Sequence, residues 1–158
     1  MGGNDGKQIK KEVDTAFQSM SAEARGAGLK IVANSTFRSF TYQDATYRSA
    51  KNSKGQKYAD SYVARPGHSE HQTGLAIDVS TLNTTIDFET TEEFKWMMQN
   101  AHKFGFILRY PEGKEYLTGY NYEPWHYRFV GVDIALKIKE EGITFDEYYA
   151  FYVSNEKK

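Results

Sequence analysis

The segment "PGHSEHQTGLAID", residues 66–78, constrains this chain more than any other stretch of its sequence. It places two of the four histidines three residues apart in a polar, glycine-marked loop, which continues into the strand-like sequence "LAID". We expect the loop to enter a buried strand, with His71 ahead of the strand and Asp78 inside it. Core packing does not require a histidine and an aspartate at these two positions, whereas a metal site would use both.

A second segment, "EPWHYR", carries Glu123 and His126 at the head of another predicted strand. Catalytic zinc sites use three nitrogen or oxygen ligands and keep one position for water. A free carboxylate beside that water can take its proton. On this interpretation His71, Asp78 and His126 would hold Zn2+, which suits imidazole better than magnesium or calcium does. Glu123, held in place by Pro124, would be the general base.

Spacing alone leaves a second interpretation open. A histidine at a strand end is commonly a hydrogen-bonded core or surface residue, and an aspartate after "GLAI" can be a turn or cap residue. We interpret His68 in this way, as a loop residue, and His102 as a surface or capping histidine. The chain has no cysteine, so any metal must be held by histidine, aspartate or glutamate.

Hydrophobic periodicity predicts helices and strands mixed along the chain. Helices are expected over 7–24, 40–52, 90–105 and 132–141. Strands are expected over 29–37, 74–80, 106–110 and 124–130. We expect two capping boxes, one formed by Thr90 with Glu93 and one by Thr144 with Glu147 at the start of a short last helix. Residues 51–57 are expected to form a surface loop. Hairpin-like connections late in the chain favour an α+β fold: a central antiparallel sheet flanked by helices, with the metal site at one edge of the sheet.

Length and charge narrow the class of protein further. The 158 residues fit one domain, expected over 7–158, and the glycine-rich residues 1–6 are expected to be a linker or cloning remnant. Twenty basic and 21 acidic side chains give a net charge of −1, which argues against nucleic-acid binding. The sequence has no run of eighteen apolar residues, so no membrane span is predicted. Its first residues lack the apolar core of a signal peptide.

Three motifs make the chain similar to the zinc D-Ala carboxypeptidase family of peptidoglycan peptidases. "SEHQTGLAID" fills the fixed positions of the S-x-H-x-x-G-x-A-x-D signature, and "EPWHYRFVG" is similar to the second motif, E-x-W/x-H. "STFRSFTYQ" is similar to the upstream segment S-G-Y-R-S-x-x-x-Q. The resemblance runs from about Leu29 to Tyr149 in family order, and implies that 7–158 form a single zinc carboxypeptidase catalytic domain.

The resemblance also implies roles for single residues. It makes His71, Asp78 and His126 the zinc ligands and Glu123 the catalytic base. One departure is visible, because Thr36 stands where the family commonly has glycine.

Further residues are implied to contact the substrate. Arg38 falls where the family has an arginine that stabilises the substrate carbonyl in the transition state. Gln43 and Ser69 fall where it contacts the peptide, including the terminal carboxylate, and Trp125 is expected to form a wall of the site. Arg65, just ahead of the metal loop, is an additional candidate for substrate contact.

What the resemblance implies is removal of a C-terminal D-Ala from peptidoglycan stem peptides or their precursor. VanY-type D,D-carboxypeptidases and LdcB-type L,D-carboxypeptidases share all three motifs, and we favour the D,D activity. The alternatives are an endopeptidase that cuts the cross-link and a non-catalytic cell-wall-binding module, and Glu123 favours an enzyme. The substrate implies an extracytoplasmic site of action, in the cell wall or on a membrane-anchored parent protein.

Overall fold

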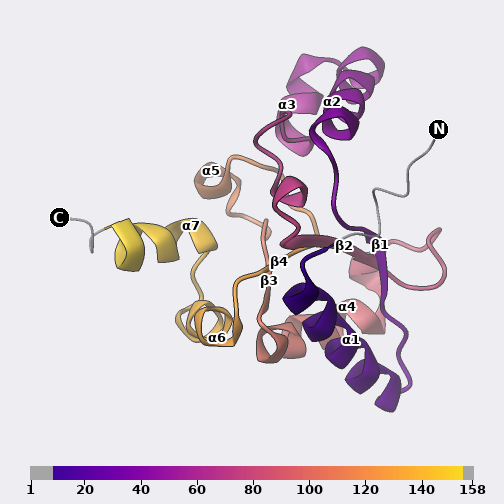
Figure 1. Ribbon diagram of the computed structural model, residues 1–158, viewed down its shortest axis with the longest axis vertical. Coiled ribbons are helices and arrows are strands. Elements are labelled where there is room, and N and C mark those ends of the chain that lie inside the picture. Colours follow the sequence, from indigo (N-terminus) through magenta and orange to yellow (C-terminus); the bar gives the residue numbers. More distant parts are fainter. Residues whose placement is uncertain (1–8, 155–158) are drawn as a thin grey trace.

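A four-stranded antiparallel sheet with helices around it makes up the computed structural model, which describes residues 9–154 (Figure 1). The strands are β1 (Val32–Ser35), β2 (Ala76–Ser80), β3 (Phe106–Leu108) and β4 (His126–Phe129), in the order β1-β2-β4-β3. The helices are α1 (Lys11–Gly26), α2 (Phe40–Lys54), α3 (Gln56–Tyr62), α4 (Glu92–Asn100), α5 (Glu115–Thr118), α6 (Val132–Glu141) and α7 (Phe145–Tyr148). Further helical turns are η2 (Glu70–Thr73), η3 (Phe88–Thr90), η4 (Ala101–Phe104) and η5 (Tyr149–Val153). The predicted α+β class is confirmed. The predicted remnant 1–6 and positions 7 and 8 of the first predicted helix lie outside the described residues.

The register of the two central strands decides which side chains share a face. Ile77 lies opposite Tyr127, and Asp78 lies opposite His126. Successive residues of a strand point to opposite faces of the sheet. Ile77 and Tyr127 therefore enter the core on one face, while Asp78 and His126 meet on the other.

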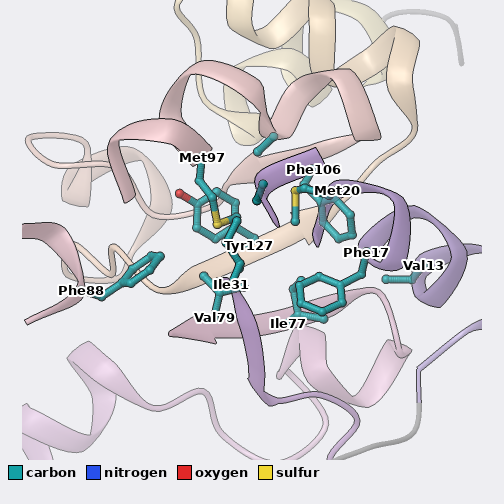
Figure 2. Close-up of a cluster of buried hydrophobic side chains, with 12 residues drawn as sticks. Val13, Phe17, Met20, Ile31, Ile77, Val79, Phe88, Met97, Phe106 and Tyr127 are labelled. Atoms are coloured by element: carbon teal, nitrogen blue, oxygen red, sulfur yellow. The ribbon is translucent and has the colours of Figure 1, made fainter. Parts of the chain in front are cut away.

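The main core fills the face that Ile77 and Tyr127 share. Figure 2 shows Val13, Phe17 and Met20 of α1 in one cluster with these two side chains. The predicted apolar stripe of the first helix is confirmed for Val13, Phe17, Met20 and Ala24, whereas Ile9 packs against this cluster from the segment before α1. Full burial of one such large side chain contributes about 1.5–3 kcal/mol, so α1 anchors the sheet from this side.

A smaller apolar cluster joins α6 to the sheet. Ile107 of β3 packs against Ala135 and Ile138 of α6. The helix has the predicted bounds and ends at Gly142, whose φ of 64° is the left-handed conformation that glycine favours. The capping box of Thr144 and Glu147 at the start of α7 is also confirmed. Among the described residues, no helix combines the length and apolarity needed to cross a membrane.

Two local predictions are wrong. The expected surface loop 51–57 is helical, because α2 continues to Lys54 and α3 begins at Gln56. Only Ala59 of α3 is buried, so this segment has no apolar stripe by which a helix is recognised. Figure 1 shows α2 and α3 as a helix pair well separated from α1 and α4.

The second wrong prediction concerns the start of α4. Thr91, and not Thr90, is the N-cap, and its hydroxyl accepts the N–H of Phe94 at 3.1 Å. Thr90 instead ends the turn η3. Two threonines in a row both fit the capping pattern, and the turn before the helix decides between them.

Candidate metal centre

His71 is placed by a short turn and a glycine. It lies in η2, which ends at Gly74 with a φ of 69°, and this left-handed residue turns the chain into β2. The Nδ1–H of His71 donates to the carbonyl oxygen of Thr36 at 2.6 Å. Its Nε2 is therefore the nitrogen left for another partner, and it lies 3.2 Å from Oδ1 of Asp78.

His126 completes the cluster from the neighbouring strand. Its Nδ1 lies 2.9 Å from the same Oδ1 of Asp78. The ligand atoms of His71, Asp78 and His126 lie within 4.8 Å of one another, and all three residues are buried. Two imidazole nitrogens and one carboxylate oxygen that converge in this way are a donor set that zinc uses in catalytic sites. The residues present fit a zinc ion.

The charges of the cluster suit a cation. Burial opposes ionisation of Asp78, but His71 and His126 hold the pKa of this carboxyl well below its usual range. Burial also favours neutral imidazole, and it lowers the pKa of His71. Against that burial, Asp78 and Glu70 raise the pKa of His126 to about 9. Without a metal, a proton on His126 therefore supplies the positive charge, and metal binding would release it.

Glu123 stands beside these donors without joining them. It lies in the turn before β4, where its backbone N–H donates to the carbonyl of Tyr110 at 3.1 Å and its own carbonyl accepts from His126 at 3.2 Å. Its Oε2 is 4.0 Å from Nδ1 of His126. Burial raises the pKa of Glu123 to about 7. A carboxyl with this position and pKa can both take and return a proton near neutral pH.

Arg38 contacts the cluster through Asp78. Its Nη2 lies 2.6 Å from Oδ2 of Asp78, and its Nε donates to Oγ of Ser35 at 3.0 Å. Its backbone N–H donates to the carbonyl of His71 at 3.3 Å. With threonine in place of the common glycine at Thr36, the loop still brings Arg38 to the site. The role of Arg38 on a substrate carbonyl stays a prediction.

A cleft of about 430 Å³ opens over the cluster. Among the residues that line it are all the predicted site residues except Arg65: Arg38, Gln43, Ser69, His71, Asp78, Glu123, Trp125 and His126. Gln43 is almost fully buried, and its Nε2 donates to the carbonyl of Ala64 at 2.7 Å. Arg65 pairs instead with Asp60 at 3.1 Å and lines a different hollow of the surface.

The match to a known protein family spans the residues of this cluster. Residues 6–132 match the family model described as VanY: D-alanyl-D-alanine carboxypeptidase. The D-alanyl-D-alanine carboxypeptidase of Enterococcus faecium is 38% identical over 150 residues, which cover 94% of this chain and 46% of that protein. The chain belongs to the VanY family.

Solved structures support membership of the VanY family. The LdcB LD-carboxypeptidase superposes with a TM-score of 0.86 at 38% identity, covering 95% of this chain and 72% of that one. A variant of the vancomycin-resistance D,D-pentapeptidase VanY in complex with Zn(II) superposes with a TM-score of 0.82 at 32% identity, covering 94% and 87%. The chain spans about half the length of the curated relatives it matches.

Sequence reasoning did not name Tyr110 and Glu70, which also line the cleft of this VanY-family site. The ring of Tyr110 stacks on that of His126, with centroids 5.0 Å apart, and Tyr120 packs on Tyr110 at 4.9 Å. Glu70 pairs with Arg109 at 2.9 Å across 39 residues of sequence. Local patterns carry no signal for such distant contacts, although the position of Glu70 next to His71 marks it as a neighbour of the cluster.

Proposed function

We propose that the chain is a zinc metallocarboxypeptidase that removes the C-terminal D-Ala from peptidoglycan stem peptides. The observation that carries the proposal is the buried convergence of His71, Asp78 and His126 beside Glu123 in a chain of the VanY family. The VanY relative in complex with Zn(II) supports zinc as the ion.

The chemistry follows from the placement of the chain's own groups. A zinc ion in this site would supply a Lewis acid for the scissile carbonyl and a water whose pKa is lowered to about 7. Glu123, whose Oε2 lies 4.0 Å from Nδ1 of His126, is proposed to accept a proton from the attacking water and to return it to the leaving nitrogen. The guanidinium of Arg38 is proposed to stabilise charge on the carbonyl oxygen, and loss of one such donor typically costs about 10²–10³ in rate.

Recognition of a free C-terminus needs polar donors close to the cleavage site. Ser69 and Gln43 line the cleft and are proposed to contact the peptide and its terminal carboxylate. Trp125 lines the same cleft with 37% of its surface exposed, and is proposed as a wall against the stem peptide.

The proposed bond is D-Ala–D-Ala. The family description and the Enterococcus faecium relative support this D,D activity. L,D cleavage is the second candidate, because the fold superposes on the LdcB LD-carboxypeptidase with a TM-score of 0.86. Either substrate belongs to the cell wall, so the proposal includes an extracytoplasmic site of action for the parent protein.

The test is hydrolysis of purified muropeptides by zinc-reconstituted protein, with pentapeptide and tetrapeptide stems side by side and mass spectrometry as the readout. We expect loss of one alanine from the pentapeptide, and no loss with the control variant Glu123→Ala. Loss from the tetrapeptide alone would show L,D activity. Separation of cross-linked dimers without shortening of either stem peptide would show an endopeptidase. If the zinc-bound protein catalysed no reaction, the non-catalytic binding module would be the remaining interpretation.

A further inference from the structure

The second nitrogen of each histidine in the cluster faces a different partner. The Nδ1–H of His71 is bonded to the carbonyl of Thr36. The Nε2 of His126 faces Oε2 of Glu70 at 3.5 Å. Nε2 of His126 and Oε2 of Glu70 are both buried, and neither atom has a hydrogen-bond partner among the described residues. A modest approach of Glu70 would pair the two unpartnered atoms.

Glu70 is held in this orientation by two guanidinium groups. Its other oxygen, Oε1, lies 2.9 Å from Nε of Arg109 and 3.1 Å from Nη1 of Arg128. Arg109 is itself held by Asp146 of α7, through contacts of 2.6 and 3.3 Å. With Oε1 occupied by two donors, Oε2 is left as the acceptor that points at the imidazole of His126.

We propose that Glu70 is a positioning residue of the metal centre, which accepts the Nε2–H of His126 and so fixes Nδ1 as the nitrogen that binds the metal. The inference rests on the zinc site of the proposed function. The geometry supports it, because Nδ1 is the His126 atom that faces Asp78, at 2.9 Å. If Nδ1 binds the metal, Nε2 carries the proton, and a buried N–H without an acceptor is unfavourable.

A rival account gives Glu70 only the task of neutralising Arg109 and Arg128. Asp146 separates the two accounts, since it also neutralises Arg109 but forms no ion pair with His126 among the described residues. Loss of the charge at Glu70 and at Asp146 would have similar effects if neutralisation were the whole role. Only Glu70 should affect metal binding if it orients His126.

The variant that tests the proposal is Glu70→Gln, which keeps the size of the side chain. Its amide oxygen should face the donors of Arg109 and Arg128, which turns the NH₂ group toward Nε2 of His126. Two donors then face each other. We expect zinc affinity, measured by competition with a chromophoric chelator, to fall by about 10–100-fold in Glu70→Gln. The matched control Asp146→Asn should change it by less than about threefold, because the groups around the metal keep their partners.

A second measurement uses the unaltered protein, so the proposal stays testable if Glu70→Gln does not fold. Long-range ¹H–¹⁵N NMR of the zinc-loaded wild type should show His126 protonated at Nε2. Protonation at Nδ1 in a zinc-loaded, active protein would overturn the role of Glu70 while leaving the proposed function intact. Equal zinc affinity of Glu70→Gln and wild type would overturn it as well. Failure of the wild type to bind zinc would overturn both proposals.

Discussion

Two buried carboxylates that approach the same nitrogen of His126, Nδ1, have opposite electrostatic surroundings. Asp78, inside β2, is within 3.2 Å of Arg38, His71 and His126, and its pKa is held well below the usual range. Glu123 lies in the turn before β4, with its Oε2 4.0 Å from Nδ1 of His126, and burial raises the pKa of Glu123 to about 7. The nearby cations decide the difference, since both side chains are buried.

The difference separates two tasks that a carboxylate can have in one site. A side chain that stays ionised at all ordinary pH values can bind a metal ion without competition from protons. A side chain with a pKa near 7 can exchange a proton during each turnover. The surroundings of the two side chains therefore support the proposal that Asp78 binds the metal and Glu123 transfers the proton.

The largest expected effect is on catalysis. Glu123→Gln should lower the rate of stem-peptide hydrolysis by about 10²–10⁴-fold, because the amide cannot accept the proton of the attacking water. Single-turnover assays with zinc-loaded protein and equal zinc content in both samples measure this loss. Hydrolysis within twofold of the wild-type rate would break the assignment of Glu123 as the base.

The second effect is on the stability of the zinc-free protein. Asp78→Asn leaves Arg38 and a protonated His126 without their buried partner, and should cost about 3–5 kcal/mol of unfolding free energy. Because the folded-state pKa of Asp78 is lowered, this contribution is present above the unfolded pKa of about 3.8 and is lost as the pH falls. Urea unfolding in the presence of a chelator at pH 7 measures it. A stability equal to that of the wild type would contradict the comparison.

The third effect has the opposite sign. The pKa of Glu123 is raised from 4.5 to about 7 in the folded protein, so its neutral form stabilises the fold below pH 4.5 and that stability is lost as the pH rises through 7. Glu123→Gln should therefore stabilise the zinc-free protein by about 1–3 kcal/mol at pH 8 and have little effect at pH 4. Urea unfolding at the two pH values compares the variant with the wild type. A variant that is less stable at pH 8 would show that Glu123 is not destabilised by burial.

The smallest effect is expected at an exposed pair of the same type as Arg38 and Asp78. Asp60 binds Arg65 at the surface, and hydrogen bonds from Tyr47 and Gln56 lower its pKa to about 2. Water screens such a pair, so Asp60→Asn should shift the unfolding midpoint far less than Asp78→Asn. Thermal unfolding of the two variants side by side gives the comparison. Equal shifts would mean that burial is not what strengthens the Asp78 contacts.

The sequence predicted the parts of the site that depend on local spacing. The alternation of a strand places Asp78 away from the core residue Ile77, and each motif carries its own histidine, so the ligand set could be proposed before the fold was known. The contacts of Glu70 with Arg109 and Arg128 join segments far apart in the sequence and depend on packing. The location of Arg65 was missed for a related reason, since its partner Asp60 lies in a helix, α3, that was expected to be partly loop.

Native mass spectrometry of zinc binding tests the division between the two carboxylates most directly. The wild type, Asp78→Asn and Glu123→Gln would be incubated with one equivalent of zinc and desalted under the same conditions. The account predicts one zinc ion on the wild type and on Glu123→Gln, and none on Asp78→Asn. Zinc retained by Asp78→Asn but lost from Glu123→Gln would contradict it.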